Sequence, residues 1–279
     1  MEFNALVAVP FELPSVPKVV ALLLGELDAD EPDLRKINQL ISTDPALTVR
    51  VLRLANSVQF QMSGRIHCAS EALALLSLAQ VKALASEATT AAATRTVAAI
   101  ALPQFWSYSL NVARVARALA GVTRQNPLAA YTCGLIHAVG ELALHRIEEL
   151  QPRIQALDTK VPPLDLRRAR VERRELGYCY AQVGAAYARQ WLFPQTVIDA
   201  LEYQYAPFDN DVYEPLAGVI HLAAWRARAR EAALSDRALA VTFPGAVGEV
   251  LGLDIDMVLQ QDPIDWNAGA VPQARRARD

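Results

Sequence analysis

The segment Tyr131-Thr-Cys-Gly-Leu-Ile-His-Ala-Val-Gly140 lies inside an apolar helical pattern that runs from Leu128 to Leu150. A pattern of this length favours a helix in the core of an all-α protein. Its polar residues His137, Glu141 and His145 recur every four positions, so one helix would place them in a single stripe. The two histidines would then lie about 12 Å apart, too far to share one metal ion. We interpret His137 as a satisfied core histidine, although His137 and Glu141 could together hold an adventitious metal.

The composition of the 279-residue chain supports the same fold class. Hydrophobic residues make up 53% of the chain, which is ample for one large domain or two smaller ones. Only 12 glycines and few hairpin turn signals argue against a β protein. Long stretches rich in Ala, Leu, Arg and Glu are instead strong helix formers.

Charge and cysteine content restrict the functional classes. The net charge of -3 and a pI of about 5.9 give no overall basic field, so nucleic-acid binding is not expected. Three widely spaced cysteines form neither a disulfide framework nor a zinc pattern, which suits a reducing cytoplasm. No signal peptide is recognisable, and the most apolar run, residues 83–102, contains Glu87 and Arg95. We predict a cytoplasmic protein that does not contact membranes.

Helix start and stop signals divide the chain into parts. Asp44-Pro45 predicts a helix start, because Asp caps well and proline is harmless in the first turn. That helix should bury an apolar face and carry two basic residues near its edge: Leu47, Val51 and Leu54, with Arg50 and Arg53. Pro103 interrupts the helical pattern further on. We predict an N-terminal helical subdomain over residues 1–102, a second helical subdomain over 103–262 and a disordered tail over 263–279.

Five motifs, in this order and at this spacing, resemble the HDOD family of HD-related output domains in bacterial signalling. They are Leu13-Pro-Ser-Val-Pro17, the long stretch from Ile41 to Ser57, Phe105 to Ala113, Gly134 to Gly140, and Glu175 to Ala185 with Trp191 to Pro194. The resemblance covers roughly residues 10–230. It implies an N-terminal helical bundle packed on a degenerate HD-type helical domain, related to the HD and HD-GYP phosphohydrolases.

The resemblance also identifies positions where the HD enzymes carry metal ligands. A hydrolytic metal site needs several converging His and Asp donors. At the His-Asp pair this chain keeps the histidine but has alanine in place of aspartate, and the other positions carry aromatic, amide or methyl side chains. The degenerate positions are Tyr108, His137, Ala138, Tyr180, Tyr203, Gln204, Tyr205 and Ala224. We therefore expect no catalytic residue, no bound metal and no cofactor.

Two interpretations of the tyrosines remain open. Tyr108, Tyr180, Tyr203 and Tyr205 could fill the space of the former metal cavity, or they could form an aromatic pocket that stacks a nucleotide. The resemblance favours a non-catalytic regulatory module that binds signalling proteins. The alternatives are a nucleotide-binding sensor without hydrolysis and a residual metal-dependent phosphohydrolase.

Basic clusters provide the candidate partner surface. Arginines gather between residues 167 and 174, and such runs are usually solvated helix faces, but they can also contact an acidic partner. Together with the basic edge of the helix that begins at Asp44, the candidate residues are Arg50, Arg53, Arg167, Arg168, Arg170, Arg173 and Arg174.

Overall fold

The computed structural model describes residues 1–61, 64–92, 97 and 99–261 of the chain. These residues form helices and connecting loops without a β-strand, apart from an isolated bridge between Val97 and Ile100. The all-α prediction is therefore confirmed. The predicted tail, residues 263–279, lies outside the described residues.

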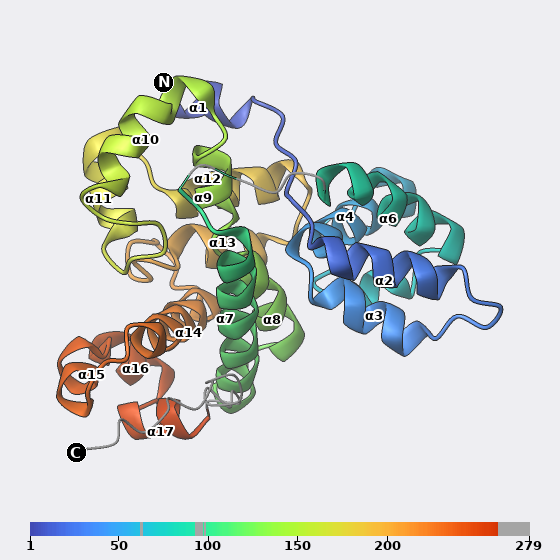
Figure 1. The fold of residues 1–279 in the computed structure, drawn as a ribbon. Helices are drawn as coiled ribbons and strands as arrows, with labels where there is room; N and C mark the ends of the chain where they lie inside the picture. The colour runs from blue at the N-terminus through green and yellow to red at the C-terminus, as the bar shows by residue number, and fades with distance from the viewer. Residues whose placement is uncertain (62–63, 93–96, 98, 262–279) are drawn as a thin grey trace, which may run out of the picture.

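One group of helices comes from the N-terminal third of the chain and lies to the right in Figure 1. Its members pack on one another, α2 against α3 and α6, and α4 against α3, α5 and α6. They are α2 (Pro17–Leu27), α3 (Leu34–Ser42), α4 (Pro45–Ala55), the 3-10 turn η1 (Val58–Phe60), α5 (Ala69–Leu73) and α6 (Leu78–Ala92).

Asp44 fixes the start of α4, as the sequence predicts. Its Oδ1 accepts a hydrogen bond from the Leu47 amide at 2.9 Å, and its Oδ2 accepts one from the Val16 amide at 2.6 Å. Burial raises the pKa of this carboxyl to about 6, against the hydrogen bonds that favour its ionised form. Leu47 and Val51 are buried as expected, whereas Leu54 is only partly covered.

The second group is built around the long helix α7, at the centre of Figure 1. Helices α8 and α14 both pack on α7, α9 packs on α12, and α13 joins α12 to α14. The central helices are α7 (Leu102–Val122), α8 (Pro127–Ile136), α9 (Val139–Leu144), α12 (Tyr180–Gln190), α13 (Gln195–Tyr203) and α14 (Pro215–Glu231). The peripheral ones are η2 (Glu148–Leu150), α10 (Gln151–Asp158), α11 (Arg168–Leu176), α15 (Asp236–Thr242), α16 (Gly245–Leu251) and α17 (Ile255–Gln260).

The prediction of a single helix from Leu128 to Leu150 is wrong. Helix α8 ends at Ile136 and α9 begins at Val139, and Ala138 between them lies outside helical geometry at φ -107 and ψ 11. Two contacts account for the break. The His137 ring donates from Nδ1 to the Gly134 carbonyl at 2.7 Å, and α9 approaches α12 so closely that a Cβ on Gly140 would lie 2.0 Å from the Tyr180 carbonyl oxygen. The apolar window Pro127–Leu144 is long enough to span a membrane by composition, but 83% of it is buried inside the fold.

The first helix of the chain lies apart from the N-terminal group. Helix α1 (Phe3–Val7) packs against α12, and the Tyr187 hydroxyl donates a 2.9 Å hydrogen bond to the Val9 carbonyl. Figure 1 shows α1 beside α10, on the opposite side of the molecule from α2 and α3. The first ten residues belong to the predicted N-terminal subdomain but contact the second group. The division of the chain at residue 102 therefore stays a prediction.

Candidate functional site

Four buried side chains meet where α7, α8, α12 and α14 converge. Tyr108 comes from α7, His137 follows α8, Tyr180 begins α12 and Arg228 lies near the end of α14. Arg228 donates from Nε to the Tyr108 hydroxyl at 2.8 Å, and its guanidinium carbon lies 5.5 Å from the centre of the Tyr108 ring. The Tyr108 and His137 ring centres are 5.3 Å apart. We call these four residues the arginine–tyrosine centre.

His137 is neutral in this centre. Burial lowers its pKa to about 3, and the positive charge of Arg228 adds to the effect. Because a carbonyl oxygen only accepts, the bond to Gly134 places the proton on Nδ1. The Nε2 atom then carries a lone pair that has no hydrogen-bond partner among the described residues. The His137 main-chain carbonyl accepts a 2.8 Å bond from the Gln204 side chain.

Arg228 is the residue that sequence reasoning missed. Its side chain is buried, which by itself lowers the pKa of a guanidinium, but the Tyr108 and Tyr180 hydroxyls outweigh this and raise it. The sequence places Arg228 between Arg226 and Arg230, which suggests a solvated basic face. One signal was available: Arg228 follows Ala224 by four positions and so shares its helix face.

The structure brings together only part of the predicted degenerate site. Tyr108, His137, Ala138, Tyr180 and Gln204 are buried. Ala224 is partly buried, and so are Tyr203 and Tyr205. Consecutive residues at the end of a helix point about 100° apart, so Gln204 faces inward while its neighbours do not. Tyr205 instead accepts a hydrogen bond from Arg173 of α11, whose guanidinium lies 5.9 Å from the ring centre. Two of the four tyrosines therefore belong to the centre.

These side chains do not fit a divalent metal. Such an ion needs several histidine, carboxylate or thiolate ligands around it. No group of three such residues that could hold an ion occurs in the described part of the chain. The centre offers instead one imidazole lone pair, two phenols and a fixed positive charge, and that charge repels a cation.

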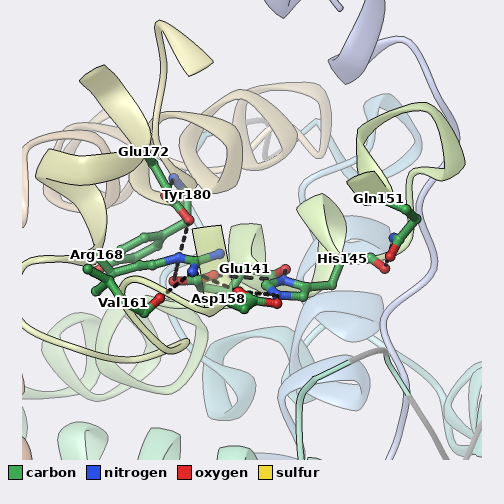
Figure 2. A network of polar contacts seen from close by, with 8 residues as sticks. All are labelled: Glu141, His145, Gln151, Asp158, Val161, Arg168, Glu172 and Tyr180. Carbon is green, nitrogen blue, oxygen red and sulfur yellow. Dashed lines mark hydrogen bonds and ion pairs between the residues drawn. The ribbon is translucent and has the colours of Figure 1, made fainter. Parts of the chain in front are cut away.

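A second buried cluster surrounds Arg168 and is shown in Figure 2. Arg168 donates from Nε to Glu172 at 2.7 Å, and from Nη1 to Asp158 at 2.8 Å and to the Val161 carbonyl at 2.6 Å. Glu141 of α9 lies 3.6 Å from Arg168 Nε. We call Glu141, His145, Asp158, Arg168 and Glu172 the ionic network.

This network corrects the predicted partner surface. Arg168 was expected on an exposed basic face, but its side chain is fully buried. The reason is helical geometry: Arg168 and Glu172 are four residues apart on the inner face of α11, whereas Arg167, Arg170 and Arg174 are exposed.

The pKa values of two carboxyl groups in the network, Glu141 and Asp158, are shifted in opposite directions. Burial raises the pKa of Glu141 well above its usual value, and the nearby Glu172 raises it further against the pull of Arg168. Neither carboxyl oxygen of Glu141 has a hydrogen-bond partner among the described residues. For Asp158, burial also raises the pKa, but His145 and Arg168 outweigh burial and lower it. Glu172 links the network to the arginine–tyrosine centre, because it accepts the Tyr180 amide proton at 2.7 Å.

Most of the remaining predicted surface arginines are paired with acids. Arg167 lies 3.1 Å from Asp165, Arg173 lies 3.2 Å from Asp209, and Arg174 lies 3.0 Å from Glu175. Arg50 lies within 4.0 Å of both Glu12 and Glu87. Arg53 and Arg170 are exposed. An open cavity of about 580 Å³ is bordered by Arg167, Arg170, Arg173 and Arg174 together with Tyr205.

Solved structures of other proteins have a similar fold. The chain is 24% identical to the MmoQ response regulator from Methylococcus capsulatus, with a TM-score of 0.70 over 91% of this chain and 98% of that one. It has a TM-score of 0.69 with a virulence factor from Campylobacter jejuni, at 16% identity over 93% of this chain and 95% of that one. An uncharacterized protein of Treponema pallidum is 27% identical over 227 residues, which are 76% of this chain and 41% of the relative's length.

The family comparison covers most of the chain. The HDOD domain matches residues 13–207, which include the N-terminal helices, His137 and the start of α12. This range also contains every predicted degenerate position except Ala224. The chain therefore belongs to the HDOD domain family.

Proposed function

We propose that this chain is a non-catalytic signalling module that acts by binding protein partners. The observation that carries the proposal is the buried guanidinium of Arg228, held by Tyr108 beside a neutral His137. A positive charge at this point opposes the binding of a divalent metal, and hydrolysis of this type needs a metal to activate water. The signalling role is supported by the HDOD match and by the likeness to a response regulator.

The partner surface that we favour is the exposed face of α11. Arg170 and Arg174 are exposed there, and Arg167 and Arg173 lie around the same open cavity. Exposed guanidinium groups suit an acidic segment of a partner protein, because they bind carboxylates in a planar, bidentate manner. Arg168 takes no part, since it is buried beneath this face.

The nucleotide-stacking alternative loses support from the same geometry. Tyr108 and Tyr180 are almost completely buried, and the Tyr108 ring already contacts both His137 and Arg228. A base could stack on these rings only if the centre opened. Aromatic filling of the former cavity is the simpler account of these two residues.

The decisive experiment measures metal content and hydrolysis with the purified full chain. We expect no stoichiometric Fe, Mn or Zn by elemental analysis. We also expect no cleavage of a phosphomonoester or a cyclic dinucleotide when Mn²⁺, Fe²⁺ or Mg²⁺ is added. The matched control is His137→Ala, which removes the one imidazole of the centre. A stoichiometric metal that disappears in His137→Ala would contradict the expectation that no metal binds, and metal-dependent hydrolysis would show that the chain is an enzyme.

A further inference from the structure

A polar cavity of about 350 Å³ lies at the junction of the two helix groups, away from the arginine–tyrosine centre. Helix α3, the start of α4 and the start of α5 form one side, and α7 and α8 form the other. The Tyr131 hydroxyl of α8 bridges the junction by donating a 2.9 Å hydrogen bond to the Ser42 carbonyl at the end of α3. Any occupant of this cavity would contact both groups.

Two arginines of α7 give the cavity its charge. Arg114 and Arg117 line it, and both are exposed on one face of the helix, three residues apart. Neither forms an ion pair with a carboxylate in the described part of the chain, and no acidic residue lines the cavity. They differ in this from Arg167, Arg173 and Arg174, which pair with acids. Burial raises the pKa of Tyr131, but both α7 arginines oppose this, which places their charges near its ring.

The other side of the cavity supplies neutral hydrogen-bonding groups. Asn38, Gln39, Ser42 and Ser70 line it. The Asn38 side-chain oxygen is buried and has no hydrogen-bond partner among the described residues, so this amide has unused hydrogen-bonding capacity beside the cavity in either orientation. The Ser42 carbonyl, which would repel an anion at the C-terminal end of α3, is already occupied by Tyr131.

We propose that this cavity binds a small molecule that carries a phosphoryl group. Two guanidinium groups match the charge of a phosphate monoester, which is about -1.5 to -2 at neutral pH, and they bind its oxygens in bidentate fashion. The Tyr131 ring and the Asn38 and Gln39 amides face the rest of the ligand. A cavity of this volume, lined by two helix groups, suits a small ligand better than a protein surface. The proposal is independent of the α11 partner surface.

Calorimetry with the full chain tests the proposal, with adenosine monophosphate, inorganic phosphate and adenosine as probes. We expect adenosine monophosphate to bind, inorganic phosphate to compete with it, and adenosine to bind at least about tenfold more weakly, since charged hydrogen bonds are lost. Arg114→Gln/Arg117→Gln should weaken adenosine monophosphate binding by about tenfold or more. Arg237→Gln is the control, because Arg237 is also exposed, on α15, and is distant in the chain.

Each outcome decides the proposal. The substituted side chains are exposed, so folding should be retained, and circular dichroism with the unfolding midpoint checks this. Equal binding by the double variant and the wild type would overturn the site, as would equal binding of adenosine and its monophosphate. No binding of either phosphate probe to the wild type would also overturn it. Binding of inorganic phosphate as tight as that of the nucleotide would support a site for the phosphoryl group alone.

Discussion

Arg168 and Arg228 are both buried cations, but their surroundings are opposite. Arg168 is held by carboxylates, since Glu172, Asp158 and Glu141 all lie within 3.6 Å of its guanidinium nitrogens. Arg228 is held by neutral groups, namely the Tyr108 hydroxyl and ring, beside an uncharged His137. Burying a charge costs free energy in both places, but the cost of removing it depends on which partner groups stay behind. Removal of Arg168 leaves buried carboxylates without a cation, whereas removal of Arg228 leaves only hydroxyl groups without a partner.

The largest expected effect follows from this difference. Arg168→Met should lower the free energy of unfolding by about 3–5 kcal/mol, because it leaves buried carboxylates without their cation. Arg228→Met should cost about 1–3 kcal/mol, the usual penalty for buried hydroxyl groups that lose a partner. Urea unfolding of both variants measures the difference, with Arg170→Met on the exposed face of α11 as the control. An equal or larger loss of stability in Arg228→Met would contradict the proposed difference between the two arginines.

The second prediction concerns the pH response of the arginine–tyrosine centre. The pKa of His137 is about 3 in the folded chain and about 6.5 when unfolded, so only the unfolded chain takes up a proton between these values. Its contribution to stability is present above pH 6.5 and is lost as pH falls toward 3. Between pH 7 and pH 5 the loss should be about 2 kcal/mol. In His137→Asn, which keeps a donor for the Gly134 carbonyl but does not titrate, this loss should disappear. A variant with the same slope as the wild type would contradict the assignment.

Glu141 of the ionic network should respond to pH with the opposite sign. The pKa of Glu141 is raised in the folded chain, so the folded chain takes up a proton at a pH where the unfolded chain does not. This contribution is present below the unfolded value of about 4.5 and is lost as pH rises through the folded value. Glu141→Gln should therefore stabilise the protein more at pH 7 than at pH 5. Arg168 and Arg228 partly offset the effect of burial on this pKa. Urea unfolding at the two pH values checks the sign.

The helical architecture was predictable because its signals are local. Asp44 followed by Pro45 specifies a helix start whatever the rest of the fold does, and the structure has the expected cap at Leu47. The break after Ile136 was not predictable in this way. It depends on the His137 ring bonding to Gly134 and on α9 meeting α12 at Gly140, and the second contact joins residues distant in the sequence.

The candidate site also depends on contacts between distant residues that local signals do not predict. Position by position, the chain could be compared with a family pattern, and this identified Tyr108, His137 and Tyr180. The burial of Arg168 and Arg228 could not be seen, because each is the one buried arginine in a run whose other arginines are exposed or partly exposed. A buried arginine is distinguished from its neighbours by its distant partners, such as Tyr108, 120 positions before Arg228.

The exposed face of α11 gives the smallest effect on stability and the sharpest contrast with Arg168 on the same helix. Arg170→Glu/Arg174→Glu should change the free energy of unfolding by no more than about 0.5 kcal/mol, because exposed charges contribute little. If this face binds an acidic partner, the same variant should lose the partner captured by the wild-type chain from a native lysate. Arg35→Glu/Arg237→Glu is the control, since it changes the net charge equally at two other exposed positions. Capture that is lost equally in both variants would reflect net charge alone. Capture that survives in Arg170→Glu/Arg174→Glu would exclude the α11 face and leave the edge of α4, at Arg50 and Arg53, as the remaining basic candidate.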